Sequence, residues 1–184
     1  MIRLKKSFDP KKRAQEVLTE LDITYGPVAV DAIAQRKGLT VRFIPLKEEL
    51  SGFIFKQASA VIVVNSLHPP NRQRFTLGHE LGHFELHLTE IGSQVHVDKK
   101  FLAFARNANS AMGWDRREIE ANQFAAELLV PHRFLIQELR GRLVDVEDED
   151  LVSELARKFG DQIDRKSTRL NSSHRSLSRM PSSA

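Results

Sequence analysis

The stretch His79-Glu80-Leu81-Gly82-His83 decides how the rest of the chain is interpreted. Two histidines four residues apart on a helix lie one turn apart, ~6 Å along the axis, with both rings on one face. Both imidazoles can therefore bind a single divalent metal ion, and Glu80 is placed to take a proton from metal-bound water rather than to bind the ion itself. The pattern indicates a metal-dependent hydrolase.

The flanking sequence argues against an alternative in which these are surface histidines and an acid on an ordinary amphipathic helix. We expect a helix over 72–88, with Asn71 as its N-cap, in which Phe75 and Thr76 share a stripe with both histidines. Imidazoles on the apolar face of a helix need partners for their ring nitrogens. A shared metal satisfies two rings at once.

Two glycines in this helix also need an explanation, because each costs ~1 kcal/mol relative to alanine in a helix interior. Gly78 and Gly82 are four residues apart and therefore lie on one face. Such a pair is expected where another backbone comes close, either a packed strand or a substrate strand.

A catalytic site needs a third protein ligand, with one position left for water. One known solution requires a glycine three residues and a histidine six residues beyond His83, but Leu86 and Thr89 occupy those positions. His87 would extend the ligand set over ~12 Å of helix, too far for one ion. We therefore interpret His87 as a residue that supports a ligand or packs in the core.

The helix predicted over 118–129 supplies acidic candidates for the third ligand. Glu118 shares its face with the small and apolar residues of this helix, whereas Glu120 shares its face with polar residues. A carboxylate on the buried side needs a partner or a metal, so we predict Glu118 as the ligand and keep Glu120 as the fallback. Asn122, one turn along, can orient a ligating side chain. The alternative is a capping box, in which Glu118 with Asp115 only satisfies the helix start.

These residues carry a family resemblance. The run 72–83 with Leu86-His87, followed by the run 118–131, resembles the ImmA/IrrE family of gluzincin-like metallo-endopeptidases. Upstream, 51–55 and 61–65 are similar to the two strands that precede the family's metal helix, so the resemblance covers roughly residues 10–160. Two independent motifs in the right order make it specific.

The resemblance implies a zinc-dependent endopeptidase that cleaves a helix-turn-helix repressor and so relieves repression in a mobile element or a stress response. It implies His79, His83 and Glu118 as metal ligands and Glu80 as the general base. Arg106 matches an arginine often found in the family, which makes it a candidate for stabilising the oxyanion; the alternative is a solvated surface arginine. Some members carry a helix-turn-helix domain on the same chain. This chain starts almost directly with the peptidase portion, so a separate repressor is the expected partner.

Zinc is the favoured metal because it suits two histidines and a glutamate with an open position, although Mn²⁺ or Fe²⁺ could occupy the same ligands. Two other functions stay open. The chain could be a non-catalytic, metal-stabilised module that binds or sequesters a repressor, or the toxin component of a toxin-antitoxin pair.

Composition narrows the class of protein. The chain has 184 residues, 41% of them hydrophobic, which is ordinary for a globular domain with one core. It has no cysteine, so disulfides and thiolate metal sites are excluded. No apolar run follows the N-terminus or approaches the ~20 residues of a membrane span. We therefore expect a cytoplasmic protein with no membrane contact.

The net charge of +4 comes from the last twenty residues. Residues 165–184 contain five basic residues, no acid and seven serines, which leaves 23 basic against 24 acidic residues in 1–164. The body is thus not basic, so we expect no direct contact with nucleic acid. We predict a single metallopeptidase domain over 1–164 and a disordered, non-native Ser/Arg-rich tail over 165–184.

The pattern of the whole chain predicts an α+β fold. We expect a small antiparallel sheet packed against a helical, zincin-like core that carries the metal helix. Beyond the two motif helices, the sequence predicts helices near 10–22, 28–37 (ended by Gly38), 132–141 and 148–159, strands at 40–45, 52–56 and 60–65, and a long loop over 89–114.

Overall fold

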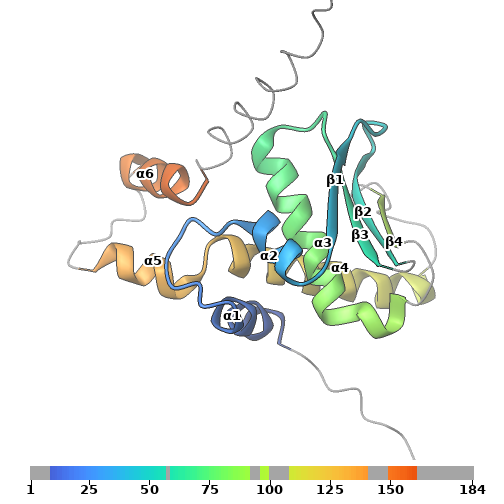
Figure 1. Ribbon diagram of the computed structural model, residues 1–184, viewed down its shortest axis with the longest axis horizontal. Coiled ribbons are helices and arrows are strands. Elements are labelled where there is room, and N and C mark those ends of the chain that lie inside the picture. The colour runs from blue at the N-terminus through green and yellow to red at the C-terminus, as the bar shows by residue number, and fades with distance from the viewer. Residues whose placement is uncertain (1–8, 57–58, 92–95, 100–107, 141–148, 161–184) are drawn as a thin grey trace, which may run out of the picture.

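The computed structural model describes residues 9–56, 59–91, 96–99, 108–140 and 149–160, which form six helices and one four-stranded sheet (Figure 1). The elements are α1 (Pro10–Glu20), α2 (Val30–Arg36), β1 (Thr40–Ile44), β2 (Leu50–Lys56), β3 (Ala60–Asn65), α3 (Pro70–Ile91), β4 (His96–Lys99), α4 (Ala108–Leu129), α5 (His132–Leu139) and α6 (Glu149–Gly160). The predicted α+β class is confirmed. Gly38 follows α2 with a φ of 79°, as expected of a glycine that ends a helix.

The sheet is mixed, and the predicted antiparallel sheet is wrong in this respect. Its strand order is β1-β3-β2-β4, with β1 parallel to β3 and β2 antiparallel to both β3 and β4. The cause is the position of β3, which inserts between β1 and β2. Because β2 reverses the chain direction and β3 reverses it again, β3 runs parallel to β1.

The predicted loop over 89–114 is also largely wrong. Helix α3 continues to Ile91, β4 pairs with β2 along this segment, and α4 begins at Ala108. The strand His96–Lys99 is short and polar, so no alternating apolar pattern reveals it. The first turns of α4 contain asparagine, serine and glycine, which local propensity assigns to turns.

The core lies where α3 meets both the sheet and α4. Ile54 and Ile62 from the sheet, Leu81 from α3, and Phe124 and Leu128 from α4 are at most 1% exposed and belong to one hydrophobic cluster. Strand β3 is buried at most of its positions because β1 and β2 flank it. Helix α3 is therefore held from two sides by packed apolar side chains.

The close backbone approach predicted at the glycines of α3 is present, but the neighbour is helix α4 rather than a strand. A Cβ at Gly82 would lie 3.1 Å from the carbonyl oxygen of Ala121 and 3.2 Å from its Cα. Gly78 has more room, because a Cβ there would lie 3.5 Å from the Cβ of Ala125. Gly82 thus permits the contact that brings α4 against the histidine face of α3.

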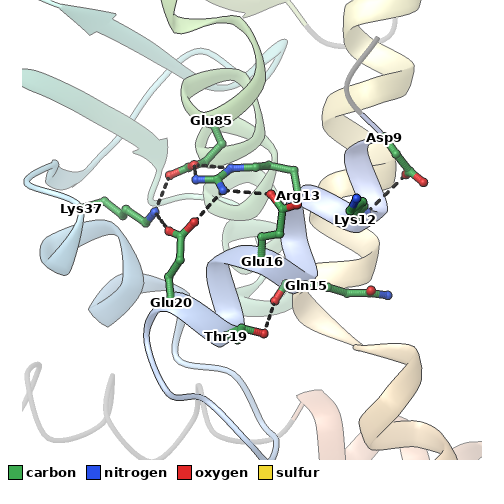
Figure 2. A network of polar contacts seen from close by, with 9 residues as sticks. All are labelled: Asp9, Lys12, Arg13, Gln15, Glu16, Thr19, Glu20, Lys37 and Glu85. Atoms are coloured by element: carbon green, nitrogen blue, oxygen red, sulfur yellow. Dashed lines mark hydrogen bonds and ion pairs between the residues drawn. The ribbon is translucent and has the colours of Figure 1, made fainter. Parts of the chain in front are cut away.

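A network of charged side chains joins the N-terminal helices to α3 (Figure 2). Arg13 on α1 contacts Glu85 on α3 at 2.6 Å and Glu20 at 2.7 Å. Lys37, directly after α2, contacts Glu20 at 2.7 Å and Glu85 at 3.3 Å. Two cations therefore share two carboxylates, one of them on the helix that carries the histidines.

Helix α6 packs against the segment between α1 and α2 and is hydrogen-bonded to α3. The ring of Phe159 lies against Gly26, and the guanidinium of Arg74 on α3 donates to the carbonyl oxygens of Phe159 and Val28. Among the helices of the described ranges, none is both long and apolar enough to cross a membrane. The predicted tail over 165–184 lies outside the described residues.

Candidate metal centre

Helix α3 places both motif histidines and the glutamate between them inside the protein. His79 is 4% exposed, and Glu80 and His83 are fully buried. The alternative in which these are surface residues is therefore wrong. Burying a carboxylate and two imidazoles is costly without compensation, which favours a specific role for this part of the helix.

Helix α4 brings Glu118 to the two histidines. Nε2 of His79 lies 3.0 Å from Nε2 of His83, and the Glu118 carboxylate oxygens lie 3.1 Å from the first nitrogen and 3.3 Å from the second. Three electron-pair donors therefore converge, as ligands around one cation do. Tetrahedral zinc with bonds of ~2.0 Å separates its ligands by ~3.3 Å, so these residues fit such an ion.

Asn122 orients the ring of His79. Its side-chain oxygen lies 2.9 Å from Nδ1 of His79, and an oxygen can only accept, so Nδ1 carries the proton. In the neutral ring the lone pair then resides on Nε2, the atom that faces Glu118 and His83. This is the contact expected of a residue that orients a metal-binding imidazole.

The Glu118 carboxylate is the most exposed of the three candidate ligands, at 31% of its side chain. Burial by itself would raise its pKa, but the contacts with His79 and His83 outweigh burial and hold the pKa well below its ordinary value. The carboxylate is therefore ionised at neutral pH. Its exposure leaves one side of the ligand set open to solvent, which a catalytic site requires.

Glu120, the fallback ligand, lies elsewhere. Its Oε2 is 3.0 Å from Nε2 of His87, and its Oε1 is 2.8 Å from Nε of Arg116. Burial would raise the pKa of Glu120, whereas the contacts with His87 and Arg116 lower it. His87, 5% exposed, also touches His83 through the two Nδ1 atoms at 3.2 Å. The structure thus places Glu118 with the histidine pair and Glu120 with His87.

The capping-box interpretation of Glu118 is wrong. Helix α4 begins at Ala108, so Asp115 and Glu118 both lie within the helix and have no helix start to satisfy. Arg106, the candidate for the oxyanion, lies outside the described residues.

Phe75 is a site neighbour whose role the sequence did not suggest. Its ring stacks on the His79 imidazole with centroids 6.4 Å apart and planes 30° apart, while 40% of the residue is exposed. The spacing of four residues before His79 was the available signal, since it places both rings on one helical face. The ring therefore adds an exposed apolar surface beside the candidate ligands.

Comparisons with known proteins show the family of the chain. The family model for the IrrE N-terminal-like domain, of the M78 peptidases, matches residues 34–161. A solved structure described as a Mycobacterium tuberculosis transcriptional regulator is similar in fold, with a TM-score of 0.52 and 20% identity over 84% of this chain and 52% of that chain. The present chain thus spans about half the length of that regulator, and the likeness concerns the fold alone. The search of curated proteins found no match. Because the family model covers most of the chain, including both helices of the metal centre, the chain belongs to the M78 peptidase family with an IrrE N-terminal-like domain.

Proposed function

We propose that the protein is a zinc-dependent endopeptidase. The observation that carries the proposal is the convergence of His79, His83 and Glu118 within 3.3 Å on two packed helices, with Glu80 buried beside the first histidine. Membership of a peptidase family supports the same chemistry. Zinc is the metal that this ligand set favours.

In the proposed mechanism His79, His83 and Glu118 would hold the metal, which would supply Lewis acidity for a bound water and for the scissile carbonyl. Asn122 keeps the proton of His79 on Nδ1, so that Nε2 remains a ligand. Glu80 accepts the proton of the attacking water and returns it to the leaving amine. Full burial of Glu80 keeps bulk water away from this proton transfer.

We propose a helix-turn-helix transcriptional repressor as the substrate. Two things support it: the family resemblance of the motif runs, and the likeness in fold to a protein described as a transcriptional regulator. Cleavage would separate the DNA-binding part of the repressor from the rest and relieve repression. In this proposal the chain acts on protein, in the cytoplasm, without contacting nucleic acid itself.

The test is Glu80→Gln in the full chain. The parent and the variant are each co-expressed with repressors encoded beside the gene, and repressor fragments are followed by immunoblot. We expect fragments with the parent, a loss of at least ~100-fold in cleavage with the variant, and unchanged zinc content, because Glu80 moves a proton and does not bind the ion. Derepression that survives Glu80→Gln without any fragment would instead support a module that sequesters the repressor.

A further inference from the structure

A line of polar contacts starts at Nδ1 of His83, the ring nitrogen that faces away from His79 and Glu118. It runs from His83 Nδ1 to His87 Nδ1 at 3.2 Å, from His87 Nε2 to Glu120 Oε2 at 3.0 Å, and from Glu120 Oε1 to Arg116 Nε at 2.8 Å. The two histidines belong to α3 and the glutamate and arginine to α4. The line therefore bridges the same two helices as the ligands do.

For a neutral His87, the chemistry of the members of this line fixes the direction of each hydrogen bond. Arg116 can only donate and the Glu120 carboxylate can only accept, so Nε2 of His87 carries a proton that it donates to Glu120. A neutral imidazole has one proton, so Nδ1 of His87 is left as an acceptor. Nδ1 of His83 must then donate to it, which leaves the His83 lone pair on Nε2. That is the atom facing His79 and Glu118.

We propose that His87 and Glu120 are positioning residues that hold His83 in the tautomer and ring orientation needed to bind the metal. A carboxylate usually contacts a metal-binding histidine directly. Here a second imidazole is inserted between the carboxylate and the ligand. The inference rests on the metal site of the proposed function and assigns it two supporting residues that do not touch the ion.

The structure also accounts for why both ligand histidines need such a partner. In the tautomer that binds a metal, the proton of each ring is on Nδ1, and the two Nε2 atoms lie 3.0 Å apart beside a carboxylate. Lone pairs so placed repel one another until a cation lies between them, so each ring needs a partner that holds this tautomer and orientation. Asn122 is that partner for His79, and the pair His87 and Glu120 is that partner for His83.

If His87 only filled space in the core, an aromatic ring of similar size would replace it without effect on metal binding. Its burial, with 5% exposed, makes this alternative a concrete one. A glutamine at the same position can accept from His83 and donate to Glu120, and so keeps the polarity of the line. The two substitutions therefore separate packing from positioning.

The experiment measures the zinc affinity of the full chain by competition with a chromophoric chelator. The variants are His87→Phe, His87→Gln and Glu120→Ala, with Gln123→Ala as a control at an exposed position of α4. Thermal unfolding of each metal-free protein reports on folding, and the visible absorption of the Co²⁺ form reports on ligand geometry.

We expect His87→Phe to bind zinc ~10–100-fold more weakly than the parent. We expect Glu120→Ala to lose several-fold in affinity, and both His87→Gln and Gln123→Ala to stay near the parent. The side chain of Glu120 is 22% exposed, so this variant tests the line even if His87→Phe fails to fold. Affinities of His87→Phe and Glu120→Ala within about twofold of the parent would overturn the positioning role alone. A parent chain that binds no zinc would overturn the proposed function and the positioning role together.

Discussion

At the scale of single residues, Glu118 and Glu120 are two glutamates on one helix that make different contacts because they point in different directions from its axis. Two residues correspond to about 200° of rotation around a helix. Glu118 therefore reaches His79 and His83, while Glu120 reaches His87 one turn further along α3.

The carboxylate of Glu20 gives a prediction for the pH dependence of stability. Its hydrogen bonds with Lys37 and then Arg13 hold its pKa below the ordinary value (Figure 2). A group whose pKa is lower in the folded state stabilises the fold above its unfolded pKa, and this contribution is lost as the pH falls through the folded pKa. We expect Glu20→Gln to be less stable than the parent at pH 7, with the difference shrinking in acid.

Urea unfolding of both proteins at pH 7 and across the acid range measures this difference. Glu48→Gln, at an exposed position outside the network, is the control and should track the parent. The effect will be small because Glu20 is well exposed to solvent. A gap between parent and Glu20→Gln that grows on acidification would contradict the assignment.

At the scale of elements, the pair of helices α3 and α4 forms the site, and Gly82 sets their separation. Two matched substitutions test this. In Gly78→Ala the new methyl meets Ala125 Cβ at an ordinary 3.5 Å, so the gain in helix propensity, up to ~1 kcal/mol, should leave stability equal or improved. In Gly82→Ala the methyl meets Ala121 backbone atoms at 3.1 and 3.2 Å, and α4 must move.

We expect Gly82→Ala to lower the free energy of unfolding by ~1–3 kcal/mol, as overpacking does. It should also weaken zinc binding, because displacing Ala121 displaces Glu118 one turn away. Chemical unfolding and chelator competition on both variants provide the measurement. Equal stability and equal zinc affinity of the two variants would show that the helix contact is not tight.

Most helices and strands could be predicted from the spacing of hydrophobic residues and from the glycines, prolines and capping residues that end them. The elements that depend on contacts with other parts of the fold could not. Residues 60–65 are rich in branched apolar side chains, and the predicted strand matches β3. Strand β4 and the first turns of α4 have no such pattern, because their local sequence favours turns and other parts of the fold decide their conformation. The direction of β1 relative to β3 depends on which strand inserts between its neighbours, and no local pattern contains that information.

At the scale of the whole molecule, the proposed metal centre links two helices that are distant in the sequence. The histidine pair on α3 was predictable because helical spacing alone puts both rings on one face. Glu118 was predictable as a candidate from the face of α4 on which it lies. That Glu118 contacts His79 whereas Glu120 contacts His87 depends on how the two helices pack. The contact of His87 with both His83 and Glu120 depends on that same packing.

A metal bound between α3 and α4 would also stabilise the fold, since any ligand that binds only the folded state does so. The helices are already joined by the core around Leu81, Phe124 and Leu128, so the metal-free chain should still fold. The predicted single domain and the role of residues 165–184 stay predictions. The central claim is the metal centre itself.

Elemental mass spectrometry of the purified full chain, measured beside Glu118→Gln, tests that claim most directly. We expect about one zinc per parent chain and much less in the variant, because three protein ligands define the site. No bound metal in the parent after zinc is supplied, or equal zinc in the two proteins, would contradict it.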